Sequence, residues 1–211
     1  MKIKMYISLA VATVFGLVFL WGINEFSYTY MLILFVVTLL FSYNAVRLYG
    51  RHNPEREHRA RRVFLWAAFV FYLLFLFLLT FSVRRATPQL IFSSRDRLNY
   101  YLKFRCNFVP FKTIRNAIKY STSFRYFAIN ILGNLAALAP LGFFLPALFR
   151  RARHFLPFTL MAALVVVFIE STQFLFCVGS CDIDDFILNV LGAVVMYAVV
   201  RVVFRRAFRE N

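Results

Sequence analysis

The residues with the most evident chemistry are carboxylates and amides that stand in or beside long apolar runs. Glu170 interrupts such a run, and Gln173 follows three residues later, so the two side chains share one helical face. If the run crosses a membrane, an ionisable side chain inside it is costly and is a functional candidate by default. Neutralisation of Glu170 by a nearby arginine is the simpler alternative.

A second group of acids opens the last apolar run. Asp182, Asp185 and Asn189 recur at helical spacing and predict one polar stripe, with the acids near a helix N-terminus, which they complement. Asp184 lies off this stripe, and its position predicts a solvated cap.

Two asparagines lie in another apolar run. Asn130 and Asn134 are four residues apart and therefore share a helical face. They either orient groups in a site or form hydrogen bonds between helices, a common use of asparagine in membranes.

Metal and nucleophile chemistry is weakly represented. Asp182, Asp184, Asp185 and Glu170 have the oxygen ligands that Mg²⁺ or Ca²⁺ prefers, but nothing in their spacing requires a cation. No Ser-His or Cys-His pair can be assembled. We therefore predict no metal and no cofactor, and we assign no catalytic residue.

The composition identifies the elements that must position these residues. Of 211 residues, 62% are hydrophobic and 16% are charged, against roughly 25% charged in a soluble domain. These values exclude a soluble enzyme, a disordered chain and a small disulfide-rich domain. Three cysteines are too few for a disulfide framework. Cys177 and Cys181 are four apart and form either a disulfide, in an oxidising compartment, or two free thiols.

The apolar runs predict an all-α integral membrane protein, a six-helix transmembrane bundle. A span needs about 20 mostly apolar residues. The first run is interpreted as a retained span because no small-residue cleavage site follows it. The expected spans are residues 5–23, 30–46, 63–83, 126–149, 157–177 and 186–204.

The charge distribution predicts the topology. The 25 Lys and Arg outnumber the nine Asp and Glu by 16. They alternate with apolar runs, which favours membrane lipid headgroups over nucleic acid as partners. Lys and Arg flank the spans on the side of both termini, and this side is therefore expected to be cytoplasmic.

Residues 84–125 break this rule, since they carry ten Lys and Arg and a single acid, Asp96, on the opposite side. Either a span is miscounted, or this outer loop is basic for a purpose. Its alternating apolar and basic residues predict amphipathic segments lying on the bilayer. Such a loop would attract phosphate, pyrophosphate or a carboxylate-bearing ligand. Together with the carboxylates and amides of the last three spans, it predicts an outer polar pocket beneath a basic roof.

We expect two parts in the chain. Residues 1–50 are two added spans with almost no polar residues, and residues 63–204 are a core of four spans with the 84–125 loop.

Four blocks in this core resemble the VanZ-like family. Residues 105–114, RCNFVPFKTI, are similar to its R-x-N-L-x-P-F-x-T-I segment, and residues 130–143 are similar to its N-x-x-G-N and P-x-G-F blocks. Residues 170–173, ESTQ, and 182–192, DIDDFILNVLG, are similar to E-x-x-Q and D-x-D-D-x-x-x-N-x-x-G. Residues 178–181 lack the basic residue that many members have there.

The resemblance implies a bacterial cytoplasmic (inner) membrane protein of the group named for resistance to teicoplanin, a lipid-tailed glycopeptide antibiotic. It supplies an antibiotic-resistance phenotype at the cell envelope but no mechanism. Our leading hypothesis is binding or alteration of a lipid-linked or lipid-tailed ligand, such as a lipid-linked cell-wall precursor or the lipoglycopeptide, which lowers glycopeptide access. The alternatives are an enzyme that modifies an isoprenoid or envelope lipid, with Glu170 or Asp185 as general base, and a non-catalytic membrane interaction module. The oligomeric state stays open.

In the leading hypothesis the ligand-binding residues have three roles. Arg105 and Lys112 meet the anionic part of the ligand, while Glu170, Asp182 and Asp185 bind its donors or hold those cations. The amides orient them: Asn107, Asn130, Asn134, Gln173 and Asn189.

Overall fold

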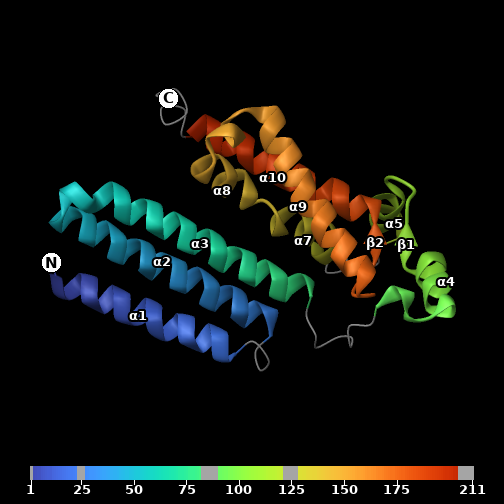
Figure 1. Cartoon of the computed structure of the whole chain (residues 1–211), viewed down its shortest axis with the longest axis horizontal. Coiled ribbons are helices and arrows are strands. Elements are labelled where there is room, and N and C mark those ends of the chain that lie inside the picture. Colours follow the sequence, from blue (N-terminus) through green and yellow to red (C-terminus); the bar gives the residue numbers. More distant parts are fainter. Residues whose placement is uncertain (1, 23–26, 82–89, 121–127, 204–211) are drawn as a thin grey trace. The chain divides into compact units, whose positions relative to one another are not determined.

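The computed structural model of the chain describes residues 2–22, 27–81, 90–120 and 128–203. These residues are helical apart from one short pair of strands (Figure 1). The contacts divide the chain into two compact units, unit 1 (Met1–Arg84) and unit 2 (Arg85–Asn211).

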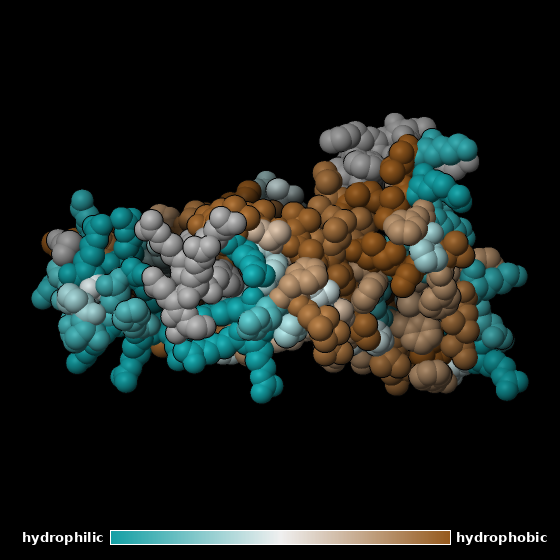
Figure 2. Space-filling view, turned by 90° about the horizontal axis from the view of Figure 1, so that it is seen from above, coloured by the Kyte–Doolittle hydropathy of each residue, from teal (hydrophilic) through white to brown (hydrophobic). Residues whose placement is uncertain are grey.

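Six helices among the described residues are long and apolar enough to cross a membrane. This confirms the predicted number of spans and the class of multi-pass membrane protein. Their outer faces expose large apolar side chains such as Leu17, Val70 and Leu164, which suit contact with lipid. Figure 2 shows hydrophobic residues over these helices and hydrophilic residues over the α2–α3 turn and over α4 and α5. The spans are Lys2–Trp21, Thr29–His52, Pro54–Thr80, Asn130–Leu148, Phe155–Leu175 and Ile183–Val203.

Unit 1 is a three-helix bundle in which α2 packs against both α1 and α3. Asn53 leaves the helical conformation and Pro54 opens the next turn, so α2 ends there. The elements are α1 (Lys2–Trp21), α2 (Tyr28–His52), η1 (Pro54–Arg56) and α3 (Glu57–Thr80).

α3 begins at Glu57, six residues before the predicted start of the third span. The added residues include Glu57 and Arg61, which form an ion pair one turn apart and are good helix formers. The helix therefore extends beyond its apolar run. The contacts place α3 in unit 1. The domain boundary that the sequence suggests between residues 50 and 63 stays a prediction.

The described part of unit 2 combines two short amphipathic helices, a pair of two-residue strands and three apolar spans. The first of these spans is broken into two helices. The elements of unit 2 are η2 (Ile91–Ser93), α4 (Arg95–Phe104), β1 (Cys106–Asn107), α5 (Lys112–Tyr120), η3 (Ala128–Leu132), α7 (Gly133–Ala137), α8 (Leu141–Leu148), η4 (Arg150–Arg153), α9 (Phe155–Leu175), β2 (Cys181–Asp182) and α10 (Ile183–Val203).

The fourth span is interrupted at residues 138–140, between α7 and α8. Pro140 has no N–H to continue the α7 ladder, and it precedes the first residue of α8. The span is therefore broken at Pro140.

Two glycines let the halves of this span approach α10 closely. A Cβ at Gly192 would lie 1.8 Å from the carbonyl oxygen of Leu135, and one at Gly142 would lie 2.4 Å from that of Ala193. Side chains larger than hydrogen do not fit at either contact. The close backbone packing fixes α10 against α7 and α8.

α4 and α5 lie within the basic segment 84–125. They have 10 and nine residues, too few to cross a bilayer. Apolar side chains such as Phe104, Phe108 and Phe111 are exposed beside the basic ones, an arrangement typical of segments at a membrane surface. The described part of this segment therefore adds no span to the count.

Candidate functional site

The candidate site lies where the 105–114 segment meets the start of α10. β1 and β2 pair in parallel, with Cys106 opposite Cys181 and Asn107 opposite Asp182. In Figure 1 these strands lie beside α5, at the end of unit 2 where α9 stops and α10 begins. Two motif blocks that are far apart in the sequence thus form one structure. Strands of two residues leave no periodic pattern, and the sequence did not predict them.

Asp184 is fully buried, so the predicted solvated cap is wrong. Its carboxylate accepts hydrogen bonds from the backbone N–H groups of Phe111 (2.5 Å), Thr113 (2.7 Å) and Ile114 (3.1 Å). These donors lie at the N-terminus of α5, where the N–H groups have no partner within the helix. A carboxylate from α10 therefore caps α5 across the fold.

The turn that delivers these donors is strained at one residue. Phe111 has a φ of 63°, in the left-handed region that non-glycine residues seldom adopt. The three bonds to Asp184 hold this turn in place. Pro110 and Phe111 belong to the segment that resembles the family motif, and both residues form part of this turn.

Asp182 has a similar positioning role. It accepts bonds from the side-chain amide of Asn107 (2.9 Å), the hydroxyl of Thr113 (2.6 Å) and the backbone N–H of Asp184 (2.9 Å). Asn107 and Asp182, both predicted to contact a ligand, thus bond to each other. Thr113 was not among the predicted site residues, although it lies in the resembling segment.

Glu170 and Asp185 differ from Asp182 and Asp184 because few hydrogen bonds from the described residues reach their carboxylates. Within the described residues, no ion pair joins either carboxylate to a lysine or arginine. Asp185 accepts a hydrogen bond from the side-chain amide of Asn134. One carboxylate oxygen of Glu170 is buried without a hydrogen-bond partner. Glu170, on α9, is close enough to Asp185 for their charges to interact.

The other predicted amides lie on the same helices or on the broken fourth span. Asn189 follows Asp185 by one turn of α10 and is half-buried. Gln173 lies beside Gly179, which adopts a φ of 81°. Asn130 is half-buried in η3, one turn before Asn134.

Arg105 and Lys112 are exposed and form no ion pair with a described residue. Both flank the strand pair and the capped turn in sequence. Among the described residues, their charges therefore do not compensate the carboxylates of Glu170 and Asp185.

The thiols gather at the same end of unit 2, and the three described cysteines are free. Cys181 lies opposite Cys106 across the strands, whereas the sequence had offered Cys177 as its disulfide partner. Burial, with a smaller effect of Cys106, raises the pKa of Cys181 to about 11, and burial also raises the pKa of Cys106. Both thiols are therefore protonated at neutral pH and are weak nucleophiles.

The carboxylates do not assemble into a recognisable metal centre. Across the described ranges, no group of three or more His, Cys, Asp and Glu side chains could hold a metal ion. The arrangement offers two acceptors, Glu170 and Asp185, of which Asp185 is held by an amide, and the same unit carries the exposed cations Arg105 and Lys112. Acceptors and cations together suit a ligand that carries both donors and an anionic group.

Comparison with known proteins places this geometry in a family. The model of the VanZ/LLP1 family matches residues 69–205, a stretch that contains all four sequence blocks and every residue of the candidate site. No curated protein and no solved structure matches the chain. Because the match covers more than half of the sequence, the chain belongs to the VanZ/LLP1 family.

Proposed function

We propose that this membrane protein binds or alters a lipid-linked or lipid-tailed ligand at the outer leaflet of a bacterial cytoplasmic membrane. Binding there lowers the access of a glycopeptide such as teicoplanin to the cell surface. In this proposal both termini are cytoplasmic, and the strand pair, α4 and α5 face outward.

One observation carries the proposal: Glu170 and Asp185 come from different spans, are partly buried and share no cationic partner within the described residues. Leaving a buried charge without compensation is costly. Ammonium, amide and hydroxyl donors of a ligand would supply the missing partners. Peptidoglycan precursors and lipoglycopeptides carry such donors together with apolar chains.

The proposed roles follow from the contacts. Glu170 and Asp185 accept the donors, and Asn134 holds the Asp185 carboxylate. Asn130, Gln173 and Asn189 orient the same part of the ligand. Arg105 and Lys112 meet its phosphate or carboxylate, since both are exposed and unpaired in the described structure.

The test compares sensitive cells that carry wild type, Asp185→Asn, Glu170→Gln or an empty vector. Labelled-teicoplanin binding and susceptibility are measured at matched membrane levels of the protein. We expect wild type alone to reduce binding, because both variants remove a charged acceptor. Asp96→Asn is the matched control: it removes an exposed acid on α4 and should behave like wild type. Full activity of Asp185→Asn would overturn the proposed site.

The same carboxylates support a second candidate, an enzyme that modifies an isoprenoid or envelope lipid. A carboxylate that forms no ion pair with a described residue is free to accept a proton from a substrate, as a general base does. Lipid extracts from cells with wild type and Glu170→Gln distinguish the two functions. A new lipid product that depends on Glu170 indicates catalysis, and unchanged lipids with reduced teicoplanin binding indicate binding alone.

A further inference from the structure

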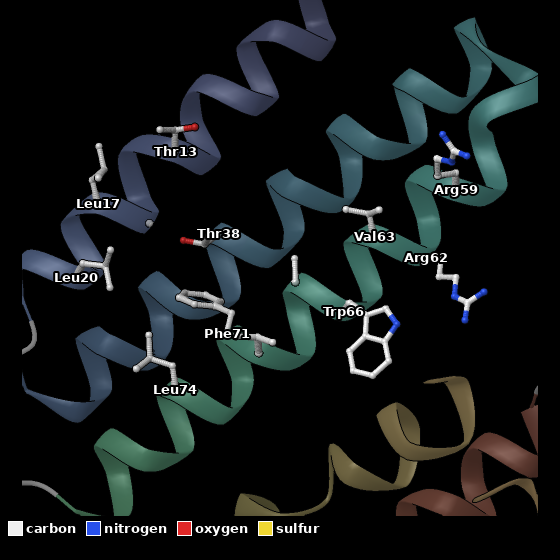
Figure 3. A pocket seen from close by; sticks show the side chains of 13 residues that line it. Thr13, Leu17, Leu20, Thr38, Arg59, Arg62, Val63, Trp66, Phe71 and Leu74 are labelled. Carbon is white, nitrogen blue, oxygen red and sulfur yellow. The ribbon is translucent and has the colours of Figure 1, made fainter. Parts of the chain in front are cut away.

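A long groove runs along unit 1, outside the four sequence blocks that lie in unit 2. It has a volume of about 950 Å³ and lies between α1 and α3, with α2 as its floor. Figure 3 shows Leu17 and Leu20 on one wall and Val63, Trp66 and Leu74 on the other. Its lining is apolar along most of its length.

Aromatic rings hold the three helices together beside the groove. The Phe19 ring of α1 lies 4.9 Å from that of Phe71 on α3, which lines the groove, and the Phe35 ring of α2 lies 4.7 Å from that of Phe75. These contacts join both α1 and α2 to α3.

The end of the groove near the start of α3 is basic. Arg59 and Arg62 line the groove there, as Figure 3 shows. A neighbouring hollow of about 730 Å³ shares Arg59 and Val63 with the groove and adds Arg56. Neither Arg59 nor Arg62 forms an ion pair with a described residue, and both side chains are exposed.

The dimensions fit one lipid chain. From Arg59 to Leu74 the α3 helix rises about 22 Å, at 1.5 Å per residue. Half of a bilayer's hydrocarbon core is about 15 Å thick. The groove therefore reaches from a basic membrane edge through the depth of one leaflet.

We propose that this groove is a binding site for an anionic phospholipid. An acyl chain lies against Leu17, Trp66 and Leu74, and the phosphate lies between Arg59 and Arg62, whose guanidinium groups suit phosphate oxygens. The charge of the mouth selects an anionic headgroup over a zwitterionic one. The site is independent of the carboxylates of unit 2.

The fluorescence of Trp66 reports which lipid occupies the groove, because Trp66 lines the groove. The chain has two tryptophans, so the other, Trp21, is replaced. The full chain carrying Trp21→Phe is reconstituted in phosphatidylcholine vesicles. The vesicles contain increasing mole fractions of either acyl-brominated phosphatidylglycerol or acyl-brominated phosphatidylcholine, whose bromines quench nearby tryptophan.

We expect the anionic lipid to quench Trp66 at a lower mole fraction than the zwitterionic lipid. Each arginine at the mouth should contribute about fivefold to this preference. Arg59→Gln with Arg62→Gln should remove it. Arg47→Gln with Arg51→Gln is the matched control, since it removes the same charge from exposed positions on α2 that do not line the groove, and it should retain the preference.

Three results would overturn the proposal. Equal quenching by the two lipids would show ordinary lipid contact without selection. A loss of preference in the control would show an effect of total charge. Absence of quenching by both lipids would show that protein covers the groove, from this chain or from a second copy.

Discussion

Asp184 extends its carboxylate from α10 into the turn before α5, where three backbone N–H groups converge on it. Its neighbour Asp185 bonds to Asn134 on α7 and forms no ion pair with a described residue. Adjacent acids thus differ in their contacts: Asp184 and Asp182 position the 105–114 segment, whereas Asp185 is the acid that we propose meets a ligand. Helical spacing alone missed this division, because the partners of Asp184 come from a segment about 70 residues earlier.

The role of Asp184 gives a prediction at this scale. Asp184→Asn removes the charge and places an NH₂ group against backbone donors. We expect a loss of about 2–4 kcal/mol in stability, since it leaves buried donors without an acceptor. Thermal unfolding of the purified protein and proteolysis within residues 105–120 measure the effect. Asp185→Asn is the comparison and should unfold like wild type; equal stability of the two variants would contradict the capping role.

At the scale of elements, the single span that α7 and α8 form together depends on close contact with α10. Gly192 meets the backbone of Leu135, whereas a Cβ at Gly133, in the same α7 segment, would have open space around it. Gly192→Ala should therefore separate the helices and destabilise unit 2 by about 1–3 kcal/mol, the usual cost of overpacking. Gly133→Ala should be neutral or stabilising, because alanine favours a helix. Unfolding temperatures in one detergent compare the two, and similar losses would contradict the packing.

Long apolar runs are the elements that sequence predicts well, because each span must satisfy its own backbone hydrogen bonds and present apolar side chains to lipid. All six predicted runs correspond to helices. β1 and β2 could not be predicted in this way, since two residues carry no period and their pairing joins Cys106 to Cys181 across 75 residues. The contact of the Phe19 ring with the Phe71 ring in unit 1 also depends on how the helices pack, which periodicity does not specify.

At the scale of the whole molecule, the proposals depend on which side of the membrane each end occupies. In the proposed topology all six candidate spans cross the membrane, so both termini lie on one side. The exposed arginines of α2 and α3 then lie with the termini, and Asp96 on α4 lies opposite. The positive-inside rule favours cytoplasmic termini, although the ten basic residues of 84–125 oppose it. The rule is weak for long segments, and the short helices α4 and α5 give those basic residues a surface role.

This orientation predicts a labelling pattern. In a chain with its three cysteines replaced by serine, Asp96→Cys should react with a membrane-impermeant maleimide on intact spheroplasts, because α4 is expected to face outward. Arg51→Cys, an exposed position at the end of α2, should react only after the membrane is permeabilised. Both positions are exposed, so protection reports sidedness rather than burial. The reverse pattern would place Glu170 and Asp185 near the cytoplasm, where they could not control glycopeptide access at the cell surface, while the lipid site between Arg59 and Arg62 would simply move to the outer leaflet.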